Sequence, residues 1–242
     1  TTKYIQESSH CIAISDEMAL EYQNRYGKYF NVIRNGASPE YFPIAIDTQD
    51  AHKKDLTICY LGRIYSWLHY DSLRLLGSAV ELCQLQGVRW KVKLYGTVDE
   101  KDLCSSGILT ANVSYEGQVG EAEGVALLRA ADLLVVPLTY NDAELENYKL
   151  SFPTKLSQFL ATGKPVLLLS SPTAASAKFC MRHNVGKLIG TPSLDEIIAY
   201  LKLLWYNPAL GHTQGLHNIQ ICRELLDLEK IRYNFQKLLV EL

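Results

Sequence analysis

The sequence predicts an α/β fold built on a doubly wound parallel sheet, with helices on both faces. From residue 56 onward, short apolar segments alternate about six times with segments of helical periodicity, the order typical of βαβ units. The segments 56–64 and 133–138 are apolar almost throughout, as expected for strands that are covered on both faces. These two observations define the fold class.

The composition is that of an ordinary globular chain. Of 242 residues, 48% are hydrophobic and 21% are charged, which fits one large or two small domains with a sizeable core. The net charge of -2 gives no indication of a nucleic-acid partner. No apolar run approaches the ~18 residues of a membrane span, so we expect no transmembrane segment.

The cysteines and histidines show no metal-ligand or disulfide pattern. The six cysteines lack CxxC and CxxH spacing, and we expect reduced, mostly buried thiols of an intracellular protein. The six histidines form no ligand spacing, so no metal is predicted. The chain has neither a signal peptide nor an initiator Met, and we expect it to be a piece of a longer protein.

The chain before residue 55 is organised differently. An apolar strand at 10–15 leads to a helix that Ser15 caps and Gly27 ends, and a second strand at 30–34 stops at the turn Asn35-Gly36. Residues 37–54 have two prolines and no periodicity. We therefore predict a separate unit at 1–36, a linker at 37–54 and a domain at 55–242.

The predicted domain contains helices and strands in regular order. Its expected elements after the first strand are a helix at 71–86, strand 90–95, helix 99–109, strand 113–115, helix 121–131, strand 132–138, helix 151–163, strand 165–169, helix 174–183, strand 185–189, helix 193–206 and a long terminal helix at 214–242.

The segment between the strands 132–138 and 165–169 has the strongest indication of a binding site. A polar loop leads there to a helix predicted to open at Ser151, with Pro153 in its first turn and Lys155 just after it. The first amides of a helix are unpaired and carry partial positive charge. A diphosphate would meet these amides, a hydroxyl and an ammonium group. An ordinary capped helix with a surface lysine is the alternative.

Arg63 follows Gly62 at the end of another predicted strand. Because parallel strands end at one edge of the sheet, Arg63 and Lys155 can converge on the same anion, with a bidentate grip from the guanidinium. A surface arginine at a turn is the alternative. His69, a few residues later, is either a phosphate or sugar contact or a solvated loop histidine.

Acidic side chains precede the predicted helix at 151. Glu144 and Glu146 can accept hydrogen bonds from sugar hydroxyls, or they belong to a solvated acidic loop. Tyr140 and Tyr148 in the same loop are further candidates for sugar contacts. The sequence contains no nucleophile elbow, no Walker-type lysine loop and no complete GxGxxG, so the catalytic residues are not assigned.

A series of short motifs resembles the carboxyl-terminal half of retaining, GT-B-fold glycosyltransferases of the group 1 type. Each motif is short, and the resemblance rests on their order and spacing, from about Cys11 to the end of the chain. The motifs are Ile12 to Met18, Asn35-Gly36, Tyr60 to Arg63, Leu94 to Gly96, Tyr115 to Gly117, Ala131 to Leu138, Pro153 to Leu156 and Ala161 to Val166.

The resemblance implies a Rossmann-like domain that binds a nucleotide-sugar donor. It places Gly62 and Arg63 at the diphosphate, and Tyr95, Gly96, Gln118 and Val119 around the base. The diphosphate set predicted from the helix opening is Ser151, Phe152, Thr154 and Lys155. The resemblance further implies that the final helix crosses back to an amino-terminal domain. No metal cofactor is expected, because a helix N-terminus and basic side chains neutralise the leaving diphosphate.

Two positions depart from the family pattern. The family has two glutamates eight positions apart, and this chain has Leu150 and Gln158 there. Gln158 can hydrogen-bond a ribose hydroxyl, whereas Leu150 cannot replace a carboxylate, so the sugar contacts would come from Glu144, Glu146 or Tyr148. The lysine usual after Gly-Arg is also missing, and Lys155 would supply its charge.

The function implied is transfer of a sugar from a nucleotide-diphosphate sugar to a glycan or lipid-linked acceptor. The acceptor would bind to a domain outside this chain, so we expect the chain to bind nucleotide and to transfer little or no sugar. The expected setting is cytoplasmic polysaccharide or cell-surface glycan assembly, peripheral at a membrane through the other domain. A nucleotide-sugar epimerase of the same fold and a degenerate, non-catalytic nucleotide-binding module are the alternatives.

Overall fold

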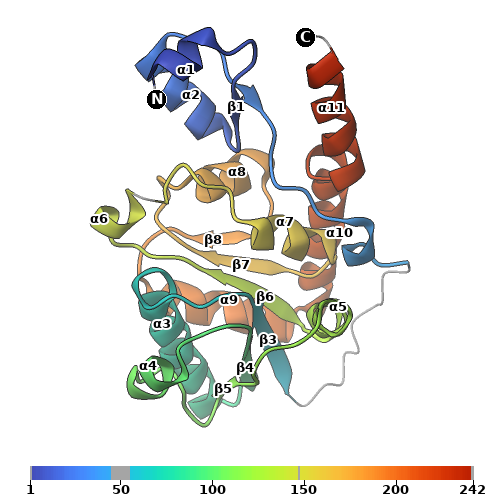
Figure 1. The fold of residues 1–242 in the computed structure, drawn as a ribbon. Coiled ribbons are helices and arrows are strands. Elements are labelled where there is room, and N and C mark those ends of the chain that lie inside the picture. The colour runs from blue at the N-terminus through green and yellow to red at the C-terminus, as the bar shows by residue number, and fades with distance from the viewer. Residues whose placement is uncertain (1, 45–54, 147, 241–242) are drawn as a thin grey trace.

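The structure, a computed structural model, describes residues 2–44, 55–146 and 148–240 (Figure 1). A six-stranded sheet with helices around it forms most of the molecule, and a small amino-terminal unit packs beside it. Of the predicted linker, residues 45–54 lie outside the described residues. No helix in the described ranges is long and apolar enough to cross a bilayer.

The sheet is entirely parallel, with the strand order β5-β4-β3-β6-β7-β8. This confirms the predicted fold class. The chain runs outward from β3 to β5 and then returns to place β6 on the other side of β3, so the order reverses between β3 and β6. The strands are β3 (Leu56–Leu61), β4 (Trp90–Tyr95), β5 (Val113–Tyr115), β6 (Leu133–Pro137), β7 (Val166–Leu169) and β8 (Lys187–Ile189).

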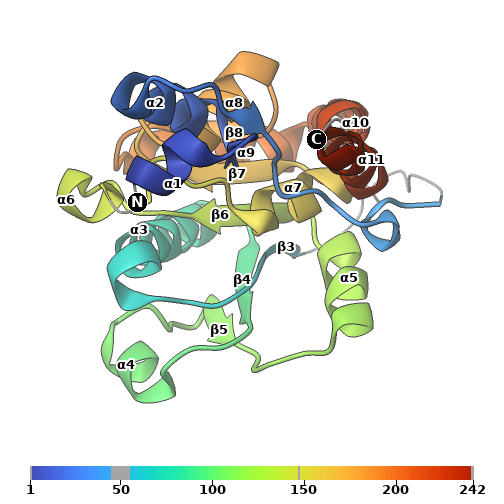
Figure 2. The ribbon, with the colours of Figure 1, turned by 45° about the horizontal axis from the view of Figure 1, so that its top comes forward.

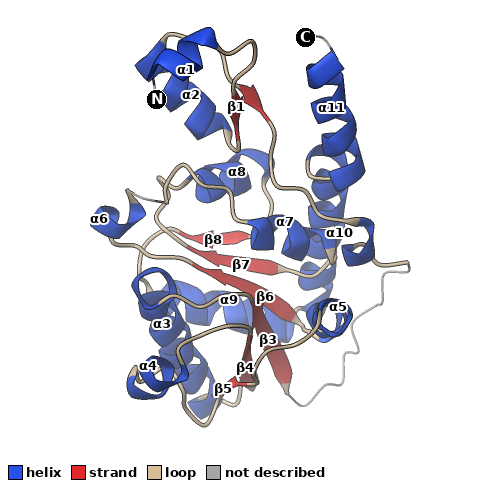
Figure 3. Ribbon diagram, in the orientation of Figure 1, coloured by secondary structure: helices blue, strands red, loops and turns tan. Residues whose placement is uncertain are grey.

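The central strands form because both of their faces are buried. All residues of β6 and β7 are buried, and Ile58 of β3 pairs with Leu133 in the sheet. Figure 3 shows the strands side by side with helices in front of and behind them. The helices are α3 (Ser66–Leu85), α4 (Glu100–Ser105), α5 (Glu121–Ala130), α6 (Asp142–Leu145), α7 (Thr154–Ala161), α8 (Ala175–His183), α9 (Leu194–Tyr206), α10 (Pro208–Leu225) and α11 (Leu228–Val240).

The helices cover the sheet in pairs. Helix α3 packs against α9, and α7 packs against α10; α7 lies in front of the sheet and α9 behind it in Figure 1. All six cysteines are free, and all except Cys104 are buried, which agrees with the predicted thiols.

The helix predicted to open at Ser151 begins three residues later, at Thr154. Pro153 is its N-cap, with ψ of 129°. A proline disfavours helical geometry in the residue before it, so the helix cannot extend back through Phe152. The predicted start of this helix at Ser151 was therefore wrong.

The predicted terminal helix is also interrupted. Helices α10 and α11 are separated at Leu226, whose carbonyl accepts a bond from the Ala37 amide at 2.7 Å, while the Leu228 amide donates to the Ala37 carbonyl at 3.1 Å. Asp227 then accepts from the amides of Glu229 and Lys230 and starts α11. Ala37 of the predicted linker thus forms backbone hydrogen bonds with Leu226 and Leu228 at the point where a continuous helix would form its own.

Several other boundaries differ from the predictions. The predicted strand 56–64 ends at Leu61, the predicted helix 99–109 spans Glu100–Ser105, and the terminal helix predicted from 214 begins at Pro208. Helix α3 starts at Ser66 rather than at 71, and the loop after β6 contains the short helix α6. The linker has a 3₁₀ turn, η1 (Pro39–Tyr41).

The amino-terminal unit has a small core of its own. It consists of α1 (Thr2–Glu7), β1 (Ile12–Ala13), α2 (Asp16–Tyr26) and β2 (Asn31–Val32). Its two strands pair in parallel through two residues each, and are therefore shorter than predicted. Cys11, Ala13, Ala19 and Phe30 are the buried residues of its cluster. The view of Figure 2 shows α2 beside α8.

Hydrogen bonds join the amino-terminal unit to the start of α7. Ser15 donates to the Leu150 carbonyl at 2.6 Å, and the Asn35 amide side chain donates to the Phe152 carbonyl at 2.7 Å. Ser157 in turn donates to the Asn35 carbonyl at 2.6 Å. The backbone on both sides of Ser151 is therefore held by residues more than a hundred positions away. The division into an acceptor-domain remnant and a donor domain remains a prediction.

Candidate functional site

A cavity of about 200 Å³ lies at the carboxyl end of the sheet, where β3 and β6 adjoin. Open α/β sheets bind ligands in the crevice at such a switch point. The start of α7 and the loop after β3 form its walls. Its lining residues are Tyr60, Arg63, Tyr65, Leu68, His69, Val136, Leu138, Tyr148, Pro153, Thr154 and Lys155.

Two glycines allow the loops after β3 and β4 to touch. Gly96 has φ of 120°, and a Cβ there would lie 2.1 Å from the carbonyl oxygen of Gly62. A Cβ on Gly62 would lie 2.9 Å from the Tyr60 hydroxyl oxygen and 3.2 Å from Cε of Lys155. Glycine at position 62 therefore leaves the Lys155 stem room to pass.

Lys155 reaches the cavity half-buried. Its Nζ donates to Oε1 of Gln158 at 3.1 Å. Burial lowers the pKa of Lys155, and the Glu121 carboxylate partly opposes this shift. A cation in a partly desolvated position gains more from an incoming anion than one in bulk water. Gln158, the candidate for the ribose contact, therefore lies next to Lys155, a candidate for the diphosphate contact.

Arg63 also faces the cavity. Its guanidinium carbon lies 5.4 Å from the centroid of the Tyr65 ring, a cation–π distance. Within the described part of the chain this guanidinium has no hydrogen-bond or ion-pair partner. Its donors are therefore available to a ligand. Arg63 and Lys155, predicted to converge, line one cavity.

The first turn of α7 completes the cationic side. Thr154 and Lys155 are its first two residues, and no side chain caps it. Their amides therefore add partial positive charge next to Arg63. Ser151 and Phe152 do not line the cavity. The Ser151 amide donates to the Tyr148 carbonyl at 2.8 Å, and the Phe152 ring is buried against Phe179.

His69 is buried and supports the loop that carries Arg63. Its Nδ1 accepts from the Tyr65 amide at 2.9 Å, and Nε2 lies 3.4 Å from the Tyr60 hydroxyl. That hydroxyl donates to the Arg63 carbonyl at 2.9 Å. An accepting Nδ1 places the proton on Nε2, and burial lowers the pKa of His69 to about 4. The neutral His69 ring, on α3, thus supports the loop after β3 that carries Arg63.

Of the sugar candidates in the loop after β6, Tyr148 alone lines the cavity. Burial raises the pKa of Tyr148 to about 12, so its hydroxyl is protonated at neutral pH. The Tyr140 hydroxyl donates to the Ile189 carbonyl at 3.1 Å, and Glu144 accepts from the Thr139 hydroxyl at 2.9 Å. Glu146 pairs with Lys149.

The base candidates lie on two adjoining loops. The Gly96 amide donates to the Gly117 carbonyl at 2.9 Å, and the Tyr115 hydroxyl donates to the Gly96 carbonyl at 2.7 Å. Tyr95 is buried, whereas Gln118 is exposed on the neighbouring loop and Val119 is half-buried. Among these base candidates, it is therefore mainly the backbone and the Gln118 side chain that a ligand can reach.

Sequence reasoning missed Tyr60, Tyr65 and Glu121. Tyr60 was recognisable as the one hydroxyl-bearing residue near the carboxyl end of an apolar strand. Glu121 had no such signal, because only packing brings α5 near Lys155.

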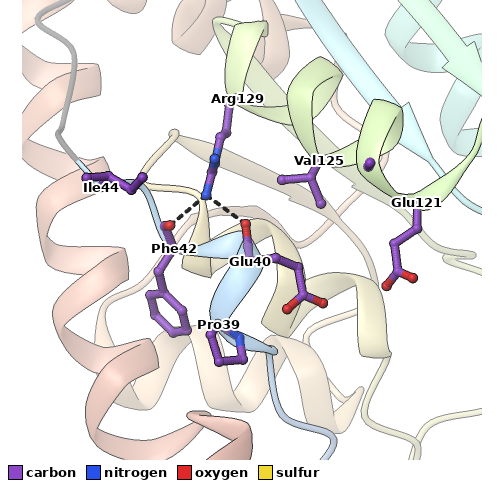
Figure 4. A pocket seen from close by; sticks show the side chains of 8 residues that line it. Pro39, Glu40, Phe42, Ile44, Glu121, Val125 and Arg129 are labelled. Atoms are coloured by element: carbon purple, nitrogen blue, oxygen red, sulfur yellow. Dashed lines mark hydrogen bonds between the residues drawn. The ribbon is translucent and has the colours of Figure 1, made fainter.

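A wider hollow of about 780 Å³ separates η1 from α5. In Figure 4, Arg129 reaches from α5 to the linker, donating to the Glu40 carbonyl at 2.7 Å and the Phe42 carbonyl at 2.6 Å. Glu121 lines the same hollow. These bonds hold the linker against the domain.

A doubly wound sheet with a cationic cavity at its switch point defines an α/β domain suited to an anionic ligand. The profile of the family "Glycosyl transferases group 1" matches residues 55–204, more than half of the chain. The chain belongs to that family, which confirms the resemblance drawn from the motifs. A comparison with curated protein sequences gives no match.

Solved structures of glycosyltransferases share the fold. Anabaena HepE, in complex with UDP and glucose, has a TM-score of 0.74 at 18% identity, over 99% of this chain and 65% of that one. Sucrose-phosphate synthase from Thermosynechococcus elongatus has a TM-score of 0.71 at 17% identity, over 99% of this chain and 60% of that one. WaaG, a glycosyltransferase involved in lipopolysaccharide biosynthesis, has a TM-score of 0.63 at 15% identity, over 90% of this chain and 60% of that one.

The likeness identifies the fold as the Rossmann-like half of a GT-B fold. The chain covers 60% of the synthase and 65% of HepE, less than two thirds of the length of either.

Proposed function

We propose that this chain carries the donor site of a glycosyltransferase and binds a nucleoside-diphosphate sugar. The observation that carries the proposal is the meeting of Arg63, Lys155 and the uncapped start of α7 at one cavity, at the switch point of the sheet. The diphosphate lies between the guanidinium and the ammonium group, with the Thr154 and Lys155 amides completing its contacts.

The same groups serve the chemistry. Transfer breaks the bond between the anomeric carbon and the diphosphate oxygen and forms a bond from that carbon to an acceptor hydroxyl, whose proton is released. Negative charge grows on the leaving diphosphate, and Arg63, Lys155 and the α7 amides are arranged to stabilise it. In this proposal no metal is needed. Stereochemistry is retained, as in the family type that the motifs resemble.

The rest of the donor extends along the rim. Gln158, adjacent to Lys155, takes the ribose, and the loops at Gly96 and Gln118 take the base. UDP is the first nucleotide to test, because several structures that share this fold contain it.

The acceptor, a glycan or lipid-linked sugar, binds mainly to a domain outside these 242 residues, and the 242 residues alone transfer little or no sugar. The setting is cytoplasmic polysaccharide or cell-surface glycan assembly, peripheral at a membrane. The family match favours a transferase over an epimerase.

A non-catalytic nucleotide-binding module is the second candidate function. It is favoured by Leu150, which replaces a carboxylate, and by the intrachain partners of Glu144 and Glu146.

Calorimetric titration with UDP, GDP and ADP, and with their glucose conjugates, tests the proposal. We expect one nucleoside diphosphate to bind, with its sugar conjugate at least as tight. Binding of the diphosphate but not of the conjugate supports the second candidate. If a folded chain binds none of them, the donor site does not exist.

A further inference from the structure

A second cavity opens on the other side of the Arg63 loop. It lies between the starts of α3 and α4, has a volume of about 390 Å³ and is called here the α3–α4 hollow. Its volume is within the range of small-molecule sites. The lining residues are Arg63, Ile64, Tyr65, Ser66, Trp67, Tyr70, Thr97, Val98, Asp99 and Asp102.

One wall of the hollow is aromatic. Trp67 is 44% exposed and Tyr65 is 40% exposed. Their ring centroids are 5.8 Å apart, with the planes inclined at 35°. Large exposed rings in a concave surface indicate a place where a ligand's apolar face is covered. Neither ring is needed to fill the protein core.

The opposite wall is polar. Asp99 uses Oδ1 to cap α4, accepting from the Lys101 and Asp102 amides, and its second oxygen remains available. The Asp102 carboxylate forms no hydrogen bond within the described residues. The hydroxyls of Ser66 and Thr97 likewise have no hydrogen-bond partner in that part of the chain.

These groups select the ligand class by elimination. Asp99 and Asp102 repel a strong anion, and Arg63 offsets much of the attraction that these carboxylates exert on a strong cation. An entirely apolar molecule would leave the carboxylates desolvated without partners. A neutral ring with one apolar face and several hydroxyls satisfies every wall: its face covers Trp67, and its hydroxyls donate to the carboxylates. That description is of a pyranose sugar.

The hollow adjoins the proposed donor site. Arg63 and Tyr65 line both cavities, so a sugar in the hollow lies one side chain away from the diphosphate. We propose that the α3–α4 hollow binds a pyranose unit of the acceptor glycan, stacked on Trp67 and held by Asp99 and Asp102. The inference rests on the proposed function, because it identifies the sugar as part of the acceptor. The donor domain thereby contributes to acceptor recognition.

Saturation-transfer NMR on the 242-residue chain tests this inference. The probes are the methyl pyranosides of glucose, galactose, mannose and N-acetylglucosamine. We expect transfer to at least one of them, reduced fivefold or more in Trp67→Ala and in Asp102→Asn. Tyr233→Ala, which removes an aromatic ring 67% exposed on α11, is the matched control and should leave the signal unchanged. Saturating UDP should not displace the sugar.

The outcomes separate the inference from the function on which it rests. Absence of transfer to all four sugars overturns the inference, as does transfer that survives Trp67→Ala or that UDP abolishes. UDP binding is measured by calorimetry on the same samples. UDP binding without sugar binding rejects the hollow alone, whereas loss of both rejects the donor site as well.

Discussion

The phosphate side and the sugar side of the candidate donor site differ in whether their polar groups already have partners within the protein. On the phosphate side, the Arg63 guanidinium and the first amides of α7 face the cavity, and no anionic side chain of the described residues pairs with them. On the sugar side, Tyr140, Glu144 and Glu146 contact residues of their own surroundings.

The difference follows from what determines each position. Arg63 and Lys155 are placed by backbone that the sheet fixes, at a strand end and at a helix start. The sugar candidates lie between β6 and α7, on the loop and on the short helix α6 within it, where side chains find partners locally. If the proposed function is right, the phosphate side is arranged for a diphosphate before the ligand binds, and the sugar contacts require rearrangement or come from Tyr148.

Gly96→Ala tests the phosphate side with the largest expected effect. Its φ of 120° and a Cβ 2.1 Å from the Gly62 oxygen should lower the free energy of unfolding by about 4 kcal/mol and abolish UDP binding. Urea denaturation measures the first effect. Gly117→Ala is the control, because it has φ of 87° and open space around its Cβ and should cost about 1–2 kcal/mol. Equal losses in both variants would show that the Gly62–Gly96 contact is unimportant.

The titration of His69 tests whether this sugar candidate is structural. Its folded-state pKa of about 4 lies below the ordinary value, so between about pH 4 and 6.5 the unfolded state binds a proton that the folded state does not. Stability should therefore be complete above about pH 6.5 and fall by roughly 3 kcal/mol as the pH drops to 4. Denaturation of His69→Gln should show a flatter pH profile over this range.

His183→Gln is the control for that profile. Burial and the neighbouring Arg182 and Arg34 also lower the pKa of His183, but this ring is more exposed, so the slope should change less. If the slope is the same in wild type and His69→Gln, the ring is exposed to water and remains available to a sugar.

Arg63→Ala and Lys155→Ala measure the phosphate side directly. Each should weaken UDP binding by about 1.5–3 kcal/mol, because each removes a charged hydrogen bond to phosphate. Calorimetry gives the affinities, and both variants should unfold at the wild-type urea concentration. Arg89→Ala, which breaks an exposed pair with Asp55 at the other end of the sheet, should bind UDP normally. Unchanged affinity in both test variants would remove the phosphate site.

The same contrast describes what could be predicted from the sequence. Alternating apolar segments predicted the parallel sheet, and strand-end and helix-start positions predicted that Arg63 and Lys155 lie close together, because backbone geometry follows local pattern. The binding roles of these residues remain predictions. The hydrogen bond of Tyr140 to Ile189 could not be predicted, since it joins two loops through packing.

Two of the boundary errors have different origins. The break between α10 and α11 depends on Ala37, nearly two hundred residues away in the chain. The start of α7 was predicted at Ser151, but the restriction that Pro153 places on the preceding residue sets the start at Thr154.

Glu144→Gln and Glu146→Gln have the smallest expected effect and decide whether the sugar side rearranges. Because both carboxylates already have partners, each change should alter UDP-glucose affinity by less than about threefold, or roughly 0.6 kcal/mol, with UDP affinity constant. Tyr148→Phe, which keeps the ring in the cavity, should weaken UDP-glucose more than either. A tenfold loss for UDP-glucose in a glutamine variant, with UDP unaffected, would mean that the loop releases its partners on binding. The two halves of the site would then be equally functional and differ only in when they become ordered.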